Sequence, residues 1–271
     1  MGELTKAVTN QPSTLPIAQI AAASARPERT VGLHFFSPVH KMPLLEIIRH
    51  EKTSDEALAA ACAVGRRLGK TIIVVSDGPG FYTSRILAPF LNEAAWLLFE
   101  GASIEAIDSA VHGWGFPVGP LALLDEVGLD IAGHAGATMA AAFGDRIETP
   151  VVFQKMLDAG RLGRKSGKGF YRYDQGPKRA DDAVTSLLQV PSKKISSGEI
   201  AERCALQMIN EAVRCLEDGI LASPTDGDIG AIFGLGFPPF RGGPFRAADA
   251  WGIRELVARL RGYEERFGRR F

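Results

Sequence analysis

The stretch TVGLHFFSPVHKMPLLEIIRH, residues 30–50, decides the fold that this sequence predicts. Residues 30–36 and 44–49 are rich in apolar and β-branched side chains, which predicts two buried strands joined by a Ser-Pro loop. Two ionisable side chains interrupt these strands, His34 in the first and Glu46 in the second. Because an unpaired imidazole or carboxylate is costly to bury, we expect the two side chains to meet.

The pair has two interpretations on the pattern alone. A histidine oriented by a carboxylate is typical of general bases that work near neutral pH. Alternatively, His34 is a core histidine with its hydrogen bonds satisfied, and Glu46 lies on an edge strand. The residues by themselves leave both interpretations open.

The composition is that of an ordinary globular protein, with 271 residues that allow one large or two modest domains. Lys+Arg and Asp+Glu both total 31, so nothing indicates a nucleic acid or an anionic membrane as partner. The three cysteines, Cys62, Cys204 and Cys215, form no CxxC motif and have no neighbouring histidine ligands. This pattern predicts buried thiols in a reducing compartment, the cytoplasm, and no metal site.

Helices and a further strand are expected after the pair. Residues 53–69 open with Thr53-Ser-Asp-Glu56, a capping-box pattern that predicts a helix. Residues 71–77, TIIVVSD, are an apolar run of strand length. Neither GxGxxG nor GxxxxGK[ST] occurs in the chain. The opening segment is therefore expected to be α/β with an open sheet edge, like the end of a larger domain.

From residue 81 onward the sequence predicts helices. Residues 81–100 carry apolar residues at helical spacing around Pro89, and Ser103 and Gly119-Pro120 start the next two helices. Further helices are expected at 131–143 and around 151–159. The glycine- and base-rich residues 162–179 favour a structural turn and a short strand, with a phosphate loop as the alternative.

The last block of the chain repeats the first helical block. Small and turn residues recur in the same order about 120 positions apart. Asn92-Glu-Ala and Glu100-Gly101 recur as Asn210-Glu-Ala and Asp218-Gly219, and Ile107-Asp108 to Gly115-Phe-Pro117 recurs around Asp228-Ile229 to Gly236-Phe-Pro238. The recurrence predicts two copies of a helical unit that pack about a pseudo-two-fold axis.

Together these motifs resemble the 3-hydroxyacyl-CoA dehydrogenases of fatty-acid β-oxidation. The resemblance covers essentially the whole chain, and within the family it extends to the dehydrogenase region of the multifunctional α-subunit that also carries enoyl-CoA hydratase activity. The segments that carry it are Leu15-Pro-Ile17, Gly32-Leu-His-Phe-Phe-Ser-Pro38, Met42-Pro-Leu-Leu-Glu46, Asp77-Gly-Pro-Gly-Phe81, Gly115-Phe-Pro-Val-Gly119, Leu124-Asp-Glu-Val-Gly128, Gly163-Arg-Lys-Ser-Gly167 and Gly234-Leu-Gly-Phe-Pro-Pro239.

The resemblance implies an N-terminally truncated chain. Residues 1–77 would be the C-terminal part of a Rossmann-type NAD-binding domain, an α/β remnant followed by a duplicated all-α domain. The first helical repeat would be residues 78–176 and the second 196–271, with a linker at 177–195. The family's glycine-rich loop and ribose-binding acidic residue would precede residue 1, so no cofactor-binding residue is assigned.

The resemblance also implies NAD-dependent oxidation of an L-3-hydroxyacyl-CoA to a 3-ketoacyl-CoA. His34 matches the family's base, which takes the 3-hydroxyl proton, and Glu46 matches the glutamate that holds it. Ser13 matches a serine that bonds the substrate hydroxyl, although its loop is one residue longer than usual. Ser37 and Ser84 replace two asparagines, and their hydroxyls would contact the substrate, Ser84 at the thioester carbonyl.

Two other functions remain open. A non-catalytic module for dimerisation or for docking a thiolase is favoured by the missing dinucleotide loop. An enzyme like 6-phosphogluconate dehydrogenase would need a lysine in the long helix, and residues 81–100 contain none.

The resemblance further implies a homo-oligomer and a thiolase β-subunit as partner. We expect His50 to be solvated and Arg85 to pair with a carboxylate across the domain interface.

Overall fold

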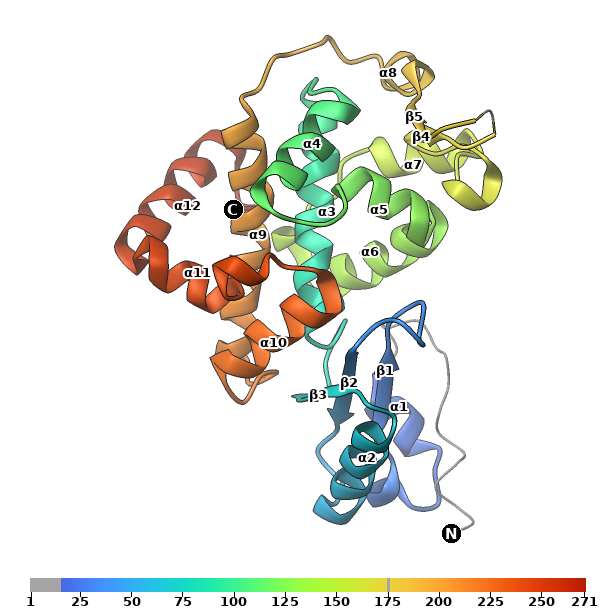
Figure 1. Ribbon diagram of the computed structural model, residues 1–271, viewed down its shortest axis with the longest axis vertical. Coiled ribbons are helices and arrows are strands. Elements are labelled where there is room, and N and C mark those ends of the chain that lie inside the picture. The colour runs from blue at the N-terminus through green and yellow to red at the C-terminus, as the bar shows by residue number, and fades with distance from the viewer. Residues whose placement is uncertain (1–15, 175) are drawn as a thin grey trace. The chain divides into compact units, whose positions relative to one another are not determined.

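The structure is a computed structural model that describes residues 16–174 and 176–271. It divides into two compact units (Figure 1). The first unit holds the described residues up to Ile86 together with Ile209–Ile253, and the second holds Leu87–Met208 with Arg254–Phe271. Two long helices, α3 (Thr83–Phe99) and α9 (Ser197–Glu217), each contribute residues to both units.

A three-stranded sheet in the order β1-β2-β3 lies at the centre of the first unit. β1 (Gly32–Phe35) pairs antiparallel with β2 (Leu44–Arg49), and β2 pairs parallel with β3 (Thr71–Ser76). α2 (Asp55–Arg67) connects the two parallel strands, which cannot be joined by a tight turn. Both strands expected within residues 30–50 are present, and the second has the expected bounds.

Different helices cover the two faces of this sheet. Leu45 and Ile47 form an apolar cluster with Ala61 of α2 on one face. On the other face α10 (Pro224–Leu235) comes so close that a Cβ added at Gly234 would lie 2.6 Å from a methyl carbon of Leu44. Since side chains alternate along a strand, Glu46 projects from the face that α10 covers.

Local capping differs in one place from the sequence prediction. Ser54, and not Thr53, caps α2, because its hydroxyl accepts a hydrogen bond from the N–H of Ala57 at 3.2 Å. Thr53 is buried, and its hydroxyl donates to the carbonyl of Thr30 at 2.8 Å. The predicted capping box therefore starts one residue too early.

The first unit is completed by short elements around the sheet. These elements are α1 (Ile17–Ala22), the 3-10 turns η1 (Pro27–Arg29) and η4 (Pro239–Arg241), and α11 (Pro244–Trp251). Asp77 accepts hydrogen bonds from the N–H groups of Ile17 at 2.9 Å and Ala18 at 2.7 Å, so it caps α1. Asp228 of α10 accepts from the N–H of Phe245 at 2.8 Å and fixes the start of α11.

The second unit is mainly helical. Besides its parts of α3 and α9 it contains α4 (Ile104–Trp114), α5 (Pro120–Val127), α6 (Leu129–Phe143), η2 (Gly144–Arg146), α7 (Val152–Asp158), η3 (Arg164–Ser166), β4 (Tyr171–Arg172), β5 (Arg179–Ala180), α8 (Asp182–Leu188) and α12 (Ile253–Phe267). Ser103 caps α4, and α5 starts at Pro120, as predicted. The predicted linker, residues 177–195, contains β5 and α8, and Val184 and Leu188 of α8 are buried.

A buried ion network joins α3, α9 and the last residues of the second unit. The Arg203 side chain is fully buried, and its nitrogens lie 2.7 Å from Glu93 and 2.7 Å from Glu100. Arg270 contacts the same two carboxylates at 3.0 and 2.8 Å. Burial raises the pKa of Glu93, and the charges of Arg203 and Arg270 oppose that rise.

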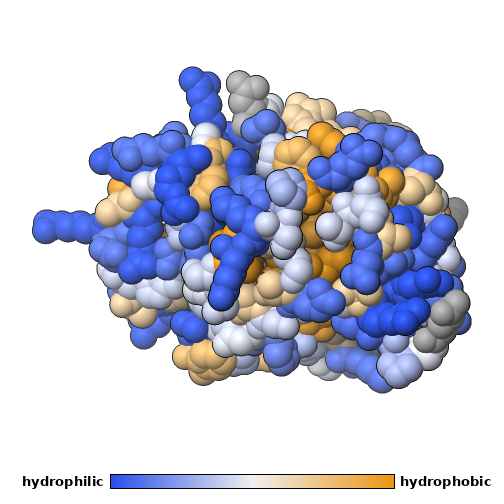
Figure 2. Space-filling view, turned by 90° about the horizontal axis from the view of Figure 1, so that it is seen from above, coloured by the Kyte–Doolittle hydropathy of each residue, from blue (hydrophilic) through white to orange (hydrophobic). Residues whose placement is uncertain are grey.

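The surface mixes polar and apolar residues. Hydrophilic side chains cover most of the face displayed in Figure 2, and apolar residues show between them. Phe240 of η4 is an exposed apolar residue, with 76% of its surface accessible. Within the residues that the structure describes, no helix combines the length and the apolar character that crossing a membrane requires.

Candidate active site

His34 and Glu46 lie directly opposite each other in the antiparallel ladder of β1 and β2. Opposite residues in such a ladder project from the same face, so strand register alone brings their side chains together. Nδ1 of His34 lies 2.7 Å from Oε2 of Glu46. The structure thus contains the expected contact, and a catalytic role for the pair remains a prediction.

Glu46 is fully buried, and both of its carboxylate oxygens accept hydrogen bonds. Oε1 accepts from the N–H groups of Tyr82 at 2.9 Å and Thr83 at 3.2 Å. Oε2 accepts from the Thr83 hydroxyl at 2.7 Å in addition to its contact with His34. A buried carboxylate is tolerated when it is satisfied in this way, because the donors replace the lost water.

The donors come from the turn between β3 and α3. Gly80 has φ 73°, and Phe81 has φ 51°, a left-handed conformation that residues other than glycine rarely adopt. The turn leads straight into Thr83, the first residue of α3. The free N–H groups at the start of this helix, and the positive end of its dipole, therefore face Glu46.

His34 itself is partly exposed, with 19% of its side chain accessible. Its ring lies against two aromatic rings, 4.7 Å from Phe36 and 5.9 Å from Phe81 between centroids. Because an ionised carboxylate can only accept a hydrogen bond, the neutral His34 ring carries its hydrogen on Nδ1, facing Glu46, and its lone pair on Nε2. Within residues 16–174 and 176–271 no group hydrogen-bonds Nε2, so this nitrogen is available to a substrate.

The three serines predicted to bind substrate have different outcomes. Ser37 is exposed and follows β1 by two residues, with a cis peptide bond to Pro38. Ser84 is partly buried and is the second residue of α3. The hydrogen bonds recorded for His34 and Glu46 in the described chain involve neither serine. Ser13 lies outside the described residues.

Three further residues of the first unit differ from expectation or were not foreseen. His50 is buried, and its Nε2 lies 3.0 Å from the Pro27 carbonyl, so the expectation that it is solvated was wrong. It is covered because η1 folds over the end of β2. Sequence reasoning also missed Thr83, and the only available signal was its position at the start of the predicted helix. Arg85 pairs with carboxylates as expected, Glu211 and Asp218, but all three residues lie within the first unit, so the expectation that the pair crosses a domain interface was wrong.

The glycine- and base-rich segment 162–179 folds around a second buried carboxylate, Asp125. Asp125 accepts hydrogen bonds from the N–H groups of Phe170 at 2.9 Å and Tyr171 at 2.8 Å, and from the Tyr173 hydroxyl at 3.1 Å. A Cβ at Gly169 would lie 1.9 Å from an oxygen of Asp125, so only glycine fits there. These contacts favour the structural turn over the phosphate loop.

Asp125 makes the stability of the protein depend on pH. Burial raises the pKa of Asp125 from 3.8 to about 6, and its hydrogen bonds only partly oppose the rise. As the pH rises, the unfolded chain therefore releases this proton at a lower pH than the folded chain does. The stabilisation of the folded state by the bound proton is complete below pH 3.8 and is lost as the pH rises through about 6. The difference between these two pKa values corresponds to about 3 kcal/mol of unfolding free energy.

Urea unfolding of the wild type and Asp125→Asn at a series of pH values tests this expectation. From about pH 4 to about pH 7 the wild type should lose about 3 kcal/mol of unfolding free energy relative to the variant, which has no proton to release. A difference between the two proteins that stays constant with pH would contradict the assignment.

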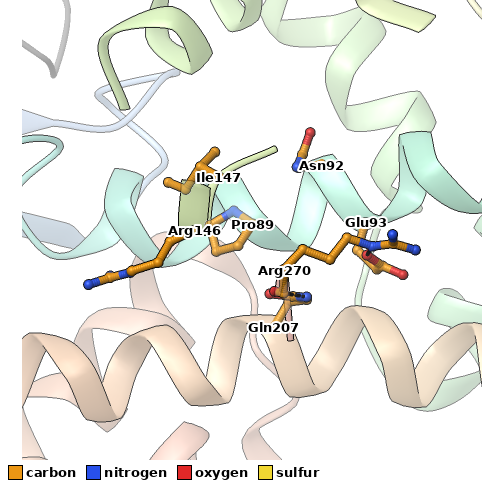
Figure 3. Close-up of a pocket in the computed structure, with 7 residues that line it drawn as sticks. All are labelled: Pro89, Asn92, Glu93, Arg146, Ile147, Gln207 and Arg270. Atoms are coloured by element: carbon orange, nitrogen blue, oxygen red, sulfur yellow. Dashed lines mark hydrogen bonds and ion pairs between the residues drawn. The ribbon is translucent and has the colours of Figure 1, made fainter. Parts of the chain in front are cut away.

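A small pocket, partly open to solvent, lies within the second unit (Figure 3). The residues that line it are Pro89, Asn92, Glu93, Arg146, Ile147, Gln207 and Arg270. Figure 3 shows Arg270 and Glu93 directed toward each other, and Gln207 donates to the Arg270 carbonyl at 2.7 Å. Three of its polar residues, Glu93, Gln207 and Arg270, are therefore already bound to one another.

Metal and dinucleotide sites would each need particular groups among the described residues. No cluster of three or more His, Cys, Asp or Glu in this part of the chain could hold a metal ion. The glycine-containing turn from β3 to α3 has the strand-to-helix form of a dinucleotide loop, but its helical N–H groups are taken by Glu46. This turn therefore does not fit the pyrophosphate of NAD.

Comparison with known proteins places the chain in a family. Residues 6–78 match the 3-hydroxyacyl-CoA dehydrogenase, NAD binding domain, and residues 80–173 match the 3-hydroxyacyl-CoA dehydrogenase, C-terminal domain. The chain belongs to the 3-hydroxyacyl-CoA dehydrogenase family, and its NAD binding domain identifies NAD as the cofactor. Its fold class is a Rossmann-like domain followed by a helical C-terminal domain.

Individual relatives agree with this assignment. The fatty acid oxidation complex subunit alpha of Shewanella amazonensis is 54% identical over 96% of this chain, and the chain spans 37% of that relative's length. The structure of (S)-3-hydroxybutyryl-CoA dehydrogenase from Ralstonia eutropha is 42% identical, with a TM-score of 0.58 over 60% of this chain and 59% of that chain. The 3-hydroxybutyryl-CoA dehydrogenase from Escherichia coli, 24% identical, shares the fold with a TM-score of 0.82 over 94% of this chain and 71% of that chain.

Proposed function

We propose that this chain supplies the catalytic base for NAD-dependent oxidation of an L-3-hydroxyacyl-CoA to a 3-ketoacyl-CoA. The observation that carries the proposal is the contact of Nδ1 of His34 with the buried carboxylate of Glu46. The names of the relatives from Shewanella and Ralstonia support the substrate class and the place of the reaction in fatty-acid oxidation. The alternative, a non-catalytic docking module, does not explain why His34 contacts the buried carboxylate of Glu46 within an apolar sheet.

In the proposed reaction the substrate loses a hydride from C3 and a proton from the 3-hydroxyl. Nε2 of His34 accepts that proton while the carbonyl forms, and the ring becomes an imidazolium. Glu46 holds Nδ1–H throughout, which fixes the tautomer and stabilises the positive ring. Phe36 and Phe81, whose rings lie against the His34 ring, would limit its rotation.

The proposed substrate contacts follow from the same assignment. Ser37 and Ser84 would donate hydrogen bonds to the substrate, Ser84 at the thioester carbonyl, where polarisation favours reaction at C3. Ser13 would bond the 3-hydroxyl. The support for Ser84 is its place beside Thr83, whose N–H and hydroxyl bind Glu46.

We also propose that the two helical blocks are copies of one unit, with the boundaries 78–176 and 196–271. Support comes from equivalent contacts in the two units. Asp108 binds the N–H groups at the start of α5, and Asp228 binds those at the start of α11. In α3, Arg85 pairs with Glu211 of α9, while in the other unit Arg203 of α9 pairs with Glu93 of α3.

Partners and location complete the proposal. The relative's name, a subunit of a fatty acid oxidation complex, supports assembly with a further subunit. We propose a thiolase β-subunit as that partner, and a homo-oligomer, on the family resemblance alone. Free cysteines, of which Cys204 and Cys215 are buried, support a reducing compartment such as the cytoplasm.

The proposed function is tested by following NADH formation from NAD with the L and D forms of 3-hydroxybutyryl-CoA and of a longer 3-hydroxyacyl-CoA. We expect the L form to be oxidised at least about a hundredfold faster than the D form, because the base and the hydride acceptor must face defined groups at C3. Circular dichroism checks that the chain is folded. A folded chain that binds NAD but forms no NADH from either form would overturn the proposal and favour the docking alternative.

A further inference from the structure

We propose that Thr83 is a positioning residue that limits the basicity of His34 through the carboxylate they share. The proposal deepens the proposed function, because it concerns the strength of the base in that same site. It rests on one geometric fact. The hydroxyl of Thr83 and Nδ1 of His34 both bind Oε2 of Glu46, and each lies 2.7 Å from that oxygen.

Thr83 is built rigidly into this position. Its side chain is fully buried, its N–H donates to Oε1 of Glu46 at 3.2 Å, and it is the first residue of α3. It therefore contacts both oxygens of one carboxylate from a single residue. A β-branched side chain at a helix start has few rotamers, so the hydroxyl is held where it is needed.

The effect on His34 follows from the charge of Oε2. A hydroxyl that donates a hydrogen bond to Oε2 partly neutralises the negative charge of this oxygen. The oxygen then stabilises a positively charged His34 ring less strongly. Without the Thr83 hydroxyl, His34 would be the remaining side chain that donates to Oε2 of Glu46, among the described residues. The His34 ring would then bind its second proton, at Nε2, more tightly. A base is most effective when its proton affinity matches the working pH, so a limit on basicity serves catalysis.

The other titratable groups near Glu46 do not take the place of the Thr83 hydroxyl. Tyr82 comes from the turn before α3, Cys215 from α9 and Asp228 from α10, and burial raises the pKa of all three. Tyr82 and Cys215 are therefore neutral near neutral pH, and the Tyr82 hydroxyl donates to the Gly227 carbonyl. Asp228 is bound to the start of α11, and Arg85 is paired with Glu211 and Asp218.

Four variants separate the hydroxyl from other properties of the residue. Thr83→Val keeps the shape and removes the hydroxyl, Thr83→Ala removes it with less bulk should valine prevent folding, and Thr83→Ser keeps it. Thr53→Val is the matched control, because Thr53 is also a buried threonine of the first unit and its hydroxyl donates to Thr30 at 2.8 Å. Thr53 makes no recorded contact with Glu46 in the described chain.

The measurement is an NMR titration of the His34 ring in the folded chain. We expect the midpoint of the His34 titration to rise by about 0.5 to 1 pH unit in Thr83→Val and Thr83→Ala. In Thr83→Ser and Thr53→Val it should stay within about 0.2 of the wild type. A midpoint unchanged in the variants that lack the hydroxyl, or one that moves equally in Thr53→Val, would overturn the proposal.

The titration does not depend on turnover, so it distinguishes the two proposals. A chain that binds NAD, forms no NADH and shows the expected shifts would overturn the proposed function and support the role of Thr83. In a chain that turns over, the acid limb of the pH profile of kcat/KM should move upward with the titration midpoint in Thr83→Val. An acid limb that does not move with the midpoint would contradict the role of Thr83 in setting the base.

Discussion

Replacing His34 with glutamine is expected to lower kcat for oxidation of an L-3-hydroxyacyl-CoA by about a thousandfold. A glutamine amide can still donate a hydrogen bond to Glu46, so the strands should keep their register, but it takes up no proton from the substrate. General bases contribute about a hundredfold to ten-thousandfold to such reactions. The loss should fall on kcat with little change in KM, because the base acts in the transition state.

The matched control for this substitution is His50→Gln. His50 is another histidine of the first unit, it is buried, and its Nε2 lies against the Pro27 carbonyl, outside the contacts of Glu46. We expect its kcat to stay within about threefold of the wild type, because an amide can replace that hydrogen bond. If His34→Gln kept kcat within about tenfold, His34 would not be the base.

Replacing Arg203 with methionine is expected to lower the unfolding free energy by about 3 to 5 kcal/mol. The Arg203 side chain is fully buried, and it pairs with Glu93 and Glu100 while its guanidinium stacks 3.9 Å from the Phe267 ring centre. Methionine restores part of the packing but leaves two carboxylates with one buried cation fewer. Urea unfolding of the whole chain measures the loss.

Arg259→Met is the control for this prediction. Arg259 belongs to the same unit and pairs with Glu202 and Glu255, but its side chain is 42% exposed. Exposed pairs contribute about 0 to 1 kcal/mol, so this variant should lose no more than that. The loss in Arg203→Met should also be smaller in acid, because the raised pKa of Glu93 lets it become neutral there. Equal losses in the two variants would contradict the role of the buried network.

Local pattern was sufficient to predict much of the fold. β2 has its predicted bounds, Ser103 caps α4, and α5 starts at Pro120, because each of these features depends on a few neighbouring residues. The meeting of His34 and Glu46 was predictable for a different reason. Two ionisable residues in adjacent apolar strands have few partners, and an antiparallel ladder brings them to one face.

The rest depends on contacts between residues far apart in the chain. Thr83 reaches Glu46 across 37 positions because the turn at Gly80 and Phe81 folds back over the sheet. The packing of α10 on β2 and the burial of His50 under η1 likewise depend on tertiary contacts that leave no local signature.

The most direct test of the central claim is the tautomer of the His34 ring. NMR spectra that correlate the ring nitrogens with the carbon-bound ring protons identify which nitrogen carries hydrogen in the neutral state. We expect hydrogen on Nδ1, held by Glu46, and a free lone pair on Nε2 facing the substrate. Hydrogen on Nε2, or rapid exchange between the two forms, would contradict the assignment of His34 as a base oriented by Glu46.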